Sequence, residues 1–235
     1  MEIENKKVVE GDIIVTTLPK DNKFYPYKVL KIESWPDESI TWHVLGYVPL
    51  DYNPTEKDIS KLSVRAWHIP IRSFEDKIQI ITHSTVTENE LQGYFEYLKL
   101  TDFPRYIKET GKNIDEVIKK ANEYYAKGNE LSDAKQYDEA IEAYTLAAEE
   151  FPLLFEAIDN RGFAKMDMGK YQEAISDFEE SLQVKPDNFT AQFSLAECYY
   201  RLKEYQKAQE EAERAITLKD EPLARDLLQK IKENL

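Results

Sequence analysis

The spacing of hydrophobic residues changes once along the chain, near residue 86. Before this point they occur in short runs rich in β-branched and aromatic side chains, which is typical of strands. Turn residues separate the runs, with Asp21-Asn22 after the first and Asn53-Pro54 in a longer loop. The pattern predicts five strands, at 13–15, 24–32, 40–48, 64–71 and 78–82. We therefore expect a small, strongly bent sheet or barrel.

Beyond residue 86 the hydrophobic residues recur at helical spacing. Thr87 and Glu90 have the spacing of a capping box, which predicts a helix start. The first helical turns present one apolar face to the sheet, formed by Leu91, Phe95 and Leu98. A long helix is expected to begin at Asn113. We therefore place the domain boundary between residues 112 and 113, with a β-rich domain at 1–112 and a helical domain at 113–235.

The helical domain repeats itself every 34 residues. Tyr137-Asp138-Glu139-Ala140-Ile141 returns as Tyr171-Gln172-Glu173-Ala174-Ile175 and as Tyr205-Gln206-Lys207-Ala208-Gln209. A fixed step of this size is typical of stacked helix pairs. Three further positions recur at the same step. The first is small and holds Gly128, Gly162 and Ala196. The second is aromatic in two copies and holds Tyr144, Phe178 and Ala212, and the third is small and holds Ala147, Ser181 and Ala215.

This small–aromatic–small pattern resembles the tetratricopeptide repeat (TPR), in three copies at 121–154, 155–188 and 189–222. The resemblance covers about half of the chain and implies a helical solenoid. A solenoid needs a terminal cap, and Pro222 precedes a last helix predicted at 223–235. The expected fold class is α+β in two domains, with a small N-terminal sheet carrying helices and a C-terminal all-α solenoid.

The negative charge is concentrated in the repeats. The formal net charge is −14, of which residues 1–112 contribute 15 − 18 = −3 and residues 113–235 contribute 16 − 27 = −11. Nucleic acid and anionic membranes are disfavoured as partners, because phosphate binding requires positive charge. The charge favours a basic protein or peptide partner. The open alternative is that acidic faces only keep the helices soluble.

The sequence offers no catalytic constellation. The histidines His43, His68 and His83 lie in or beside predicted strands without metal-motif spacing, so we expect no metal, no cofactor and no enzyme activity. Glycine-rich phosphate loops and nucleophile elbows are missing. The single cysteine, Cys198, is expected to be a reduced packing residue. With no secretory pattern and no long apolar run, we expect a soluble cytoplasmic protein.

The TPR resemblance implies a concave groove lined by the first helix of each repeat. We expect this groove to be aromatic and acidic, with one cation, Arg201. The residues that match groove positions are Tyr125, Asn129, Asp133, Glu156, Asp159, Asn160, Phe163, Asp167, Phe193, Glu197, Tyr200 and Arg201. Packing between repeats is the alternative role for Tyr125, Phe163 and Phe193.

One TPR subclass holds the C-terminal carboxylates of heat-shock chaperones between two asparagines and three cations. Both asparagines are present, as Asn129 and Asn160, but the cation positions are Tyr125, Thr190 and Ser194. Carboxylates need charge-assisted donors. Chaperone tails are therefore not expected as partners.

Three functions follow from these observations. The first is a non-catalytic protein-interaction module, expected to be monomeric, that grips its partner in the groove. The second is an immunity protein that neutralises a bacterial polymorphic toxin, since Gly11–Val15 and Tyr27–Ile32 resemble the start of such proteins and of SH3-like barrels. The third is an enzyme in 1–112 with the repeats as a targeting arm, for which the sequence names no reaction.

Overall fold

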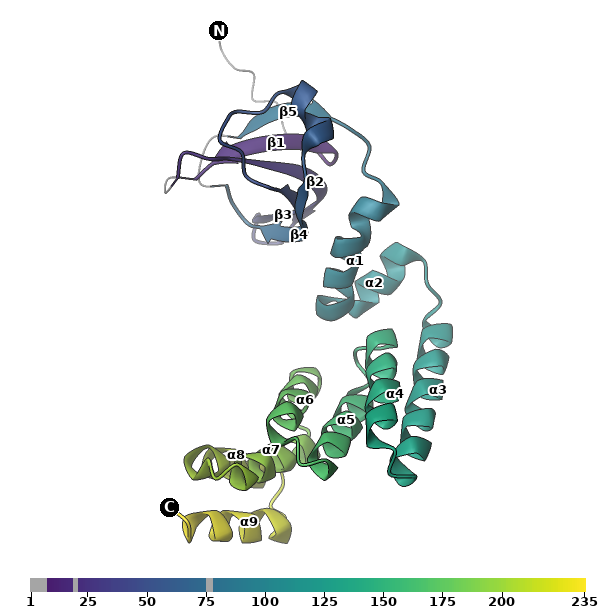
Figure 1. The fold of residues 1–235 in the computed structure, drawn as a ribbon, viewed down its shortest axis with the longest axis vertical. Helices are drawn as coiled ribbons and strands as arrows, with labels where there is room; N and C mark the ends of the chain where they lie inside the picture. Colours follow the sequence, from purple (N-terminus) through teal and green to yellow (C-terminus); the bar gives the residue numbers. More distant parts are fainter. Residues whose placement is uncertain (1–7, 19–20, 75–77) are drawn as a thin grey trace. The chain divides into compact units, whose positions relative to one another are not determined.

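The computed structural model describes residues 8–18, 21–74 and 78–235, and it divides the chain into two compact units. The N-terminal unit spans Met1–Thr110, and the C-terminal unit spans Gly111–Leu235 (Figure 1). In its described residues the first contains the sheet, one 3-10 helix and two α-helices, and the second contains only helices. None of the described helices is long and apolar enough to cross a membrane.

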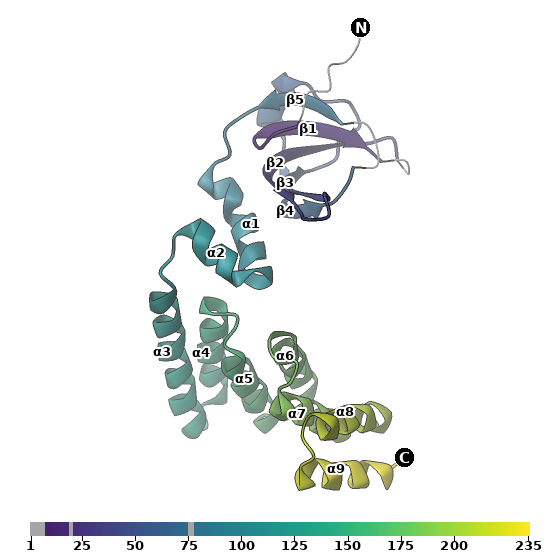
Figure 2. The same ribbon diagram turned by 180° about the vertical axis from the view of Figure 1, so that it is seen from behind.

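The N-terminal unit is built on one antiparallel five-stranded sheet with the order β4-β3-β2-β1-β5 (Figure 2). The strands are β1 (Asp12–Thr17), β2 (Phe24–Ser34), β3 (Ile40–Tyr47), β4 (Val64–Ile71) and β5 (Gln79–His83). The five predicted strands are thus confirmed, and the two strands on either side of Asp21-Asn22 pair antiparallel. A 3-10 helix, η1 (Glu56–Lys61), lies in the predicted long loop.

The two faces of the sheet bury different kinds of side chain. One face holds a hydrophobic cluster centred on Ile14, Val29 and Val44. The other face carries buried polar residues, among them Lys28 and His43, each less than 5% exposed. Buried polar groups are costly unless they have hydrogen-bond partners. Lys28 finds its partner in Glu90, which belongs to the helix that follows the sheet.

Two helices complete the N-terminal unit, α1 (Glu88–Thr101) and α2 (Phe103–Thr110). The predicted capping box of Thr87 and Glu90 is present at the start of α1. Helix α1 contacts β4 and β2, but its buried residues are Tyr94 and Leu98. Leu91 and Phe95, predicted to cover the sheet, are only half-buried, because the face is turned toward Tyr94 and its polar partners.

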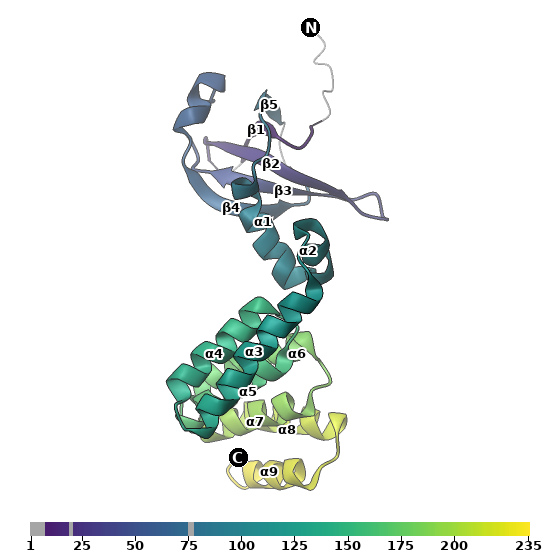
Figure 3. The same cartoon turned by 90° about the vertical axis from the view of Figure 1, so that its right-hand side faces the viewer.

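The C-terminal unit is a stack of antiparallel helix pairs (Figure 3). Sequential helices contact each other from α3 to α9. Their bounds are α3 (Ile114–Asp133), α4 (Tyr137–Glu150), α5 (Phe155–Asp167), α6 (Tyr171–Val184), α7 (Phe189–Arg201), α8 (Tyr205–Leu218) and α9 (Pro222–Lys232). The three predicted repeats correspond to the pairs α3–α4, α5–α6 and α7–α8, and the last helix begins at Pro222.

The small and aromatic positions of the repeat meet inside each pair. A Cβ added to Gly128 would lie 2.5 Å from the Tyr144 ring, and one added to Gly162 would lie 2.9 Å from Phe178. In the third repeat both positions are alanine, and both are fully buried. The third repeat thus has alanine in place of both the ring and the glycine. The added methyl group of Ala196 takes up part of the space that a ring would fill, so the two helices stay in contact.

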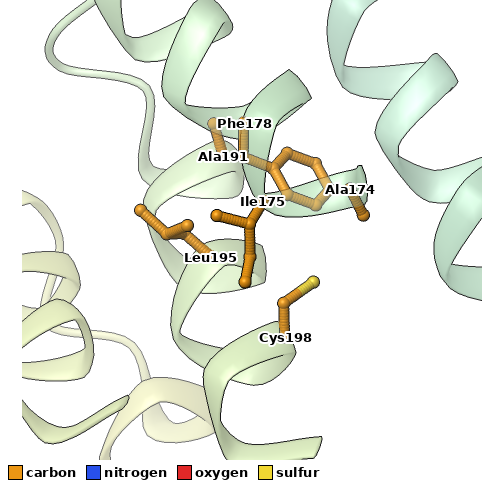
Figure 4. Close-up of a cluster of buried hydrophobic side chains, with 6 residues drawn as sticks. All are labelled: Ala174, Ile175, Phe178, Ala191, Leu195 and Cys198. Carbon is orange, nitrogen blue, oxygen red and sulfur yellow. The ribbon is translucent and has the colours of Figure 1, made fainter. Parts of the chain in front are cut away.

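Hydrophobic contacts join the second pair to the third, and the third pair to α9. Figure 4 shows one such cluster, in which α6 and α7 bury Ile175, Phe178, Leu195 and Cys198 together. The Cys198 thiol is fully buried, and burial raises its pKa to about 12, so the thiol is protonated at neutral pH. This agrees with a packing role.

Candidate partner-binding groove

A depression of about 330 Å³ lies among α3, α4 and α5, and we call it the Asp133 pocket. Four of the twelve predicted groove residues line it. Its lining consists of Asn129, Ser132, Asp133, Tyr144, Asn160 and Phe163. Five of these six side chains carry oxygen or nitrogen, so the pocket is polar with one apolar wall.

Hydrogen bonds hold the two asparagines of the pocket together. The Tyr144 hydroxyl donates to Asn129 Oδ1 at 2.9 Å, and Asn160 Nδ2 donates to the same oxygen at 3.0 Å. Asn160 Nδ2 also donates to the Tyr125 hydroxyl at 3.2 Å. Within the described chain this leaves Asn129 Nδ2 and Asn160 Oδ1 without a hydrogen bond. The pocket therefore offers one oriented amide donor and one oriented amide acceptor.

The two basic residues of α5, Arg161 and Lys165, form ion pairs with carboxylates of α6. Arg161 contacts the buried Asp177 at 2.9 Å and Glu180 at 2.7 Å, and Lys165 contacts the other Asp177 oxygen at 2.7 Å. Both cations are largely buried in this cluster. They are thus engaged and do not balance the charge of the exposed Asp133.

Asp159 is buried, at 6% exposure, and does not line the groove surface. Its Oδ2 accepts a hydrogen bond of 2.7 Å from Asn188, the N-cap residue of α7. Burial raises the pKa of this carboxyl. Asp159 therefore joins α5 to α7 inside the stack. Glu156 and Asp167, two other predicted groove residues, are exposed.

The third repeat contributes packing more than free surface. Phe193 and Tyr200 are half-buried against a cluster that includes Leu227 and Ile231 of α9. Arg201, the predicted groove cation, pairs with Glu197 at 3.0 Å, and its side chain is half-exposed. Phe193 thus has the alternative packing role in this structure, and Tyr200 packs in the same cluster.

A second polar cluster lies in the N-terminal unit, where sequence reasoning did not connect its members. His43 Nδ1 lies 2.8 Å from His68 Nε2, and His43 Nε2 lies 3.1 Å from Glu33. Arg105 of α2 pairs with the same Glu33 and donates to the Tyr94 hydroxyl at 2.8 Å. This cluster joins the sheet to both helices.

Burial disfavours the charged form of both histidines of this cluster. Burial lowers the pKa of His43. It is also the main cause that lowers the pKa of His68 to about 4, with a smaller contribution from repulsion by His43 when that ring is protonated. His83 lies apart and contacts Asp12 at 3.0 Å. Among the described residues, no group of three or more His, Cys, Asp or Glu side chains is arranged to hold a metal ion.

Sequence reasoning missed Ser132 and Tyr144 as pocket residues. Ser132 directly precedes Asp133, and Tyr144 holds the aromatic position of the repeat. The Tyr144 ring is buried at 2% exposure, as that position predicts, while its hydroxyl reaches the pocket. A tyrosine where the second repeat has Phe178 was the one available signal.

Comparisons with known proteins agree with the helical repeats. Two family models, both described as tetratricopeptide repeat, match residues 124–152 and 165–231. An uncharacterized protein of Methanocaldococcus jannaschii is 36% identical over 72 residues, which cover 31% of this chain and 84% of that protein.

Other relatives are much longer than the matching segment. Hsp70-Hsp90 organizing protein 1 of Glycine max is 29% identical over 161 residues, covering 68% of this chain and 27% of that protein. Sperm-associated antigen 1 of Mus musculus is 28% identical over 116 residues, covering 49% of this chain and 13% of that protein. The chain thus spans less than a third of either relative.

Among solved structures, the first TPR of Spaghetti bound to the HSP90 peptide SRMEEVD is similar to this chain. It is 26% identical, with a TM-score of 0.48, and the match covers 49% of this chain and 92% of that one.

Proposed function

Because the chain belongs to the tetratricopeptide repeat family through its C-terminal unit, we propose that this unit is a protein-interaction module for a basic segment of a partner. The observation that carries the proposal is the Asp133 pocket, in which an exposed carboxylate lies beside polar acceptors while Arg161 and Lys165 are bound to Asp177. A basic side chain would supply the missing positive charge.

The charge of the whole unit supports the same partner. Residues 113–235 carry a formal net charge of 16 − 27 = −11. Such a field attracts a basic segment from a distance and raises the association rate, while the pocket supplies specificity. The interaction would therefore weaken as salt concentration rises.

Acidic chaperone tails are poor candidates on the same grounds. A peptide such as SRMEEVD, bound by the Spaghetti domain, carries several carboxylates. In this chain the corresponding cation positions are Tyr125, Thr190 and Ser194, and Ser194 is buried at 3% exposure. Carboxylates placed beside Asp133 would lack charge-assisted donors and would be repelled.

Affinity capture from the native lysate, read by mass spectrometry, tests the proposal. The groove variant is Asp133→Lys/Asp167→Lys, because both carboxylates are exposed. The matched control is Glu139→Lys/Glu142→Lys, which makes the same charge change in a separate depression lined by Tyr124 and Leu131. We expect a basic protein to be retained by wild type and control and lost by the groove variant.

Two other results would count against the module. Equal retention of every captured protein by all three baits would reject the groove as the binding site. Loss of the captured protein from both charge variants alike would show that binding depends only on the overall negative charge of the unit and not on the groove. If the retained protein is a basic bacterial toxin, the immunity function becomes the specific form of the proposal.

A further inference from the structure

We propose that the Asp133 pocket is a subsite for a single arginine side chain of the partner segment. This inference rests on the proposed function and specifies which chemical group the module recognises. The pocket volume of about 330 Å³ lies at the lower end of small-ligand sites. It is therefore suited to one side chain rather than to a folded element.

The pocket presents mainly hydrogen-bond acceptors. The Asp133 carboxylate is exposed, and in the described part of the chain no lysine or arginine lies within ion-pair distance of it. Asn160 Oδ1 has no donor among the described residues, and the Ser132 hydroxyl lies in the same lining. A guanidinium group has five N–H donors and no acceptor, so it complements this lining.

The apolar wall of the pocket also fits a planar cation. The Phe163 ring is half-buried and lies 5.3 Å from the Phe178 ring, centroid to centroid, at an interplanar angle of 60°. This contact holds one side of Phe163 in the helix pair. A guanidinium stacks on an aromatic face and forms paired hydrogen bonds with a carboxylate at the same time, which an ammonium group does not.

The remaining amide donor of the pocket, Asn129 Nδ2, would bind the backbone of the ligand. Asn129 Oδ1 already accepts from Tyr144 and Asn160, so its Nδ2 group is the part left for a ligand. A backbone carbonyl next to the arginine would accept from it. A carboxylate ligand would meet one neutral donor and the Asp133 charge, which is an unfavourable match.

The placement of Asp133 indicates a role other than stability. Asp133 is the last residue of α3, and Asp167 is the last residue of α5. Carboxylates at helix C-termini are unfavourable, because they lie at the negative end of the helix dipole. In the third repeat the same position holds Arg201, the charge that the dipole favours. A bound cation would offset the cost at Asp133.

The test is a titration of the full chain, followed by NMR, with the blocked amino acid N-acetyl-arginine N-methylamide. N-acetyl-citrulline N-methylamide has nearly the same shape without the charge, and the blocked lysine has the charge without the plane. We expect arginine to shift the side-chain amides of Asn129 and Asn160, and to bind about tenfold more tightly than citrulline. Asp133→Asn should remove this preference, while Glu142→Gln, on another face of the same repeat, should retain it.

The possible results separate the subsite from the module. Equal binding of arginine and citrulline, or an unchanged preference in Asp133→Asn, would overturn the subsite. Equal binding of lysine would overturn its assignment to arginine. If partner capture depends on Asp133 and Asp167 while the arginine probe shows no preference, the module stands and the subsite is rejected. If capture is indifferent to both carboxylates, the proposed module itself is rejected.

Discussion

The Tyr144 hydroxyl donates a 2.9 Å hydrogen bond to Asn129 Oδ1, so a core ring of α4 orients a pocket side chain of α3. Tyr144→Phe keeps the ring and removes this bond. We expect the free energy of unfolding of the C-terminal unit to fall by about 1 kcal/mol. Denaturant unfolding followed by far-UV circular dichroism measures the change.

The matched control for this prediction is Tyr205→Phe. The Tyr205 ring is half-buried, and its hydroxyl has no hydrogen bond among the described residues. An equal loss in both variants would show that the Tyr144 hydroxyl makes no specific contribution. Reorientation of Asn129 should appear only in Tyr144→Phe, as a shift of its side-chain amide signals.

The contact between Gly128 and Tyr144 predicts that Gly128→Ala destabilises the first repeat. Alanine normally stabilises a helix relative to glycine, by about 1 kcal/mol. Here the added Cβ would lie 2.5 Å from the ring, so overpacking should reverse the sign and cost about 1–3 kcal/mol. Thermal unfolding by circular dichroism would show a lower midpoint. The same change in a Tyr144→Leu background should cost less, and a gain in stability with Tyr144 intact would contradict the contact.

The histidine cluster predicts that the N-terminal unit loses stability in weak acid. The folded-state pKa values of His43 and His68 lie below the ordinary value of 6.5, with His68 at about 4. The unfolded chain therefore binds more protons between these values, and stability should fall as pH drops from about 6.5 to about 4. The charges that face the pair are Glu33, Arg105 and Glu109. The two glutamates favour the charged form of His43, and Arg105 disfavours it. Burial has the largest effect on the pKa of His43 and lowers it.

Tryptophan fluorescence is a specific probe for this prediction, because all three tryptophans lie in the N-terminal unit, at positions 35, 42 and 67. Denaturant midpoints across this pH range should decline in wild type and decline less in His68→Gln. His83→Gln is the control, since His83 lies outside the cluster and is 58% exposed. A pH dependence unaffected by His68→Gln would assign the acid sensitivity to other groups.

The ion pair between buried Lys28 and half-buried Glu90 predicts a large cost when the carboxylate is removed. Lys28 Nζ lies 2.8 Å from both Glu90 oxygens and donates to the Thr85 carbonyl at 2.9 Å. Glu90→Gln leaves a buried charge without its counterion and should cost about 3 kcal/mol. The double variant Lys28→Met/Glu90→Gln should recover part of this loss. Tryptophan fluorescence reads the effect, and Glu88→Gln in the same helical turn should be nearly neutral.

The helix-end carboxylates predict a small gain in stability when they are neutralised. Asp133→Asn removes a negative charge from the C-terminus of α3, which should stabilise the C-terminal unit by about 0.3–1 kcal/mol. The gain should shrink in high salt. Arg201→Gln at the equivalent position should have the opposite sign. A loss of stability in Asp133→Asn would mean that this carboxylate serves a structural role.

The sequence by itself determined the elements of this protein, because their signals are local. Strand runs, the capping box of Thr87 and Glu90, and the 34-residue step all depend on residues close together in the chain. The repeat step also identified the small positions Gly128 and Gly162 and the aromatic positions Tyr144 and Phe178, and in the structure each glycine lies against the ring of its own helical hairpin. These features follow from the local geometry of strands and helices and need no knowledge of distant partners.

Only the tertiary structure decided which polar groups are free. Asn160 binds Asn129 across 31 residues, and His43 meets His68 across 25 residues. The groove prediction could not show that Asp159 turns inward to Asn188, because the length of a side chain and the angle of its helix decide such contacts. Hydrophobic periodicity specifies which face of a helix is buried. The partners of a charge on that face depend on packing between helices, and this packing leaves Asp133 exposed and without a counterion in the described chain.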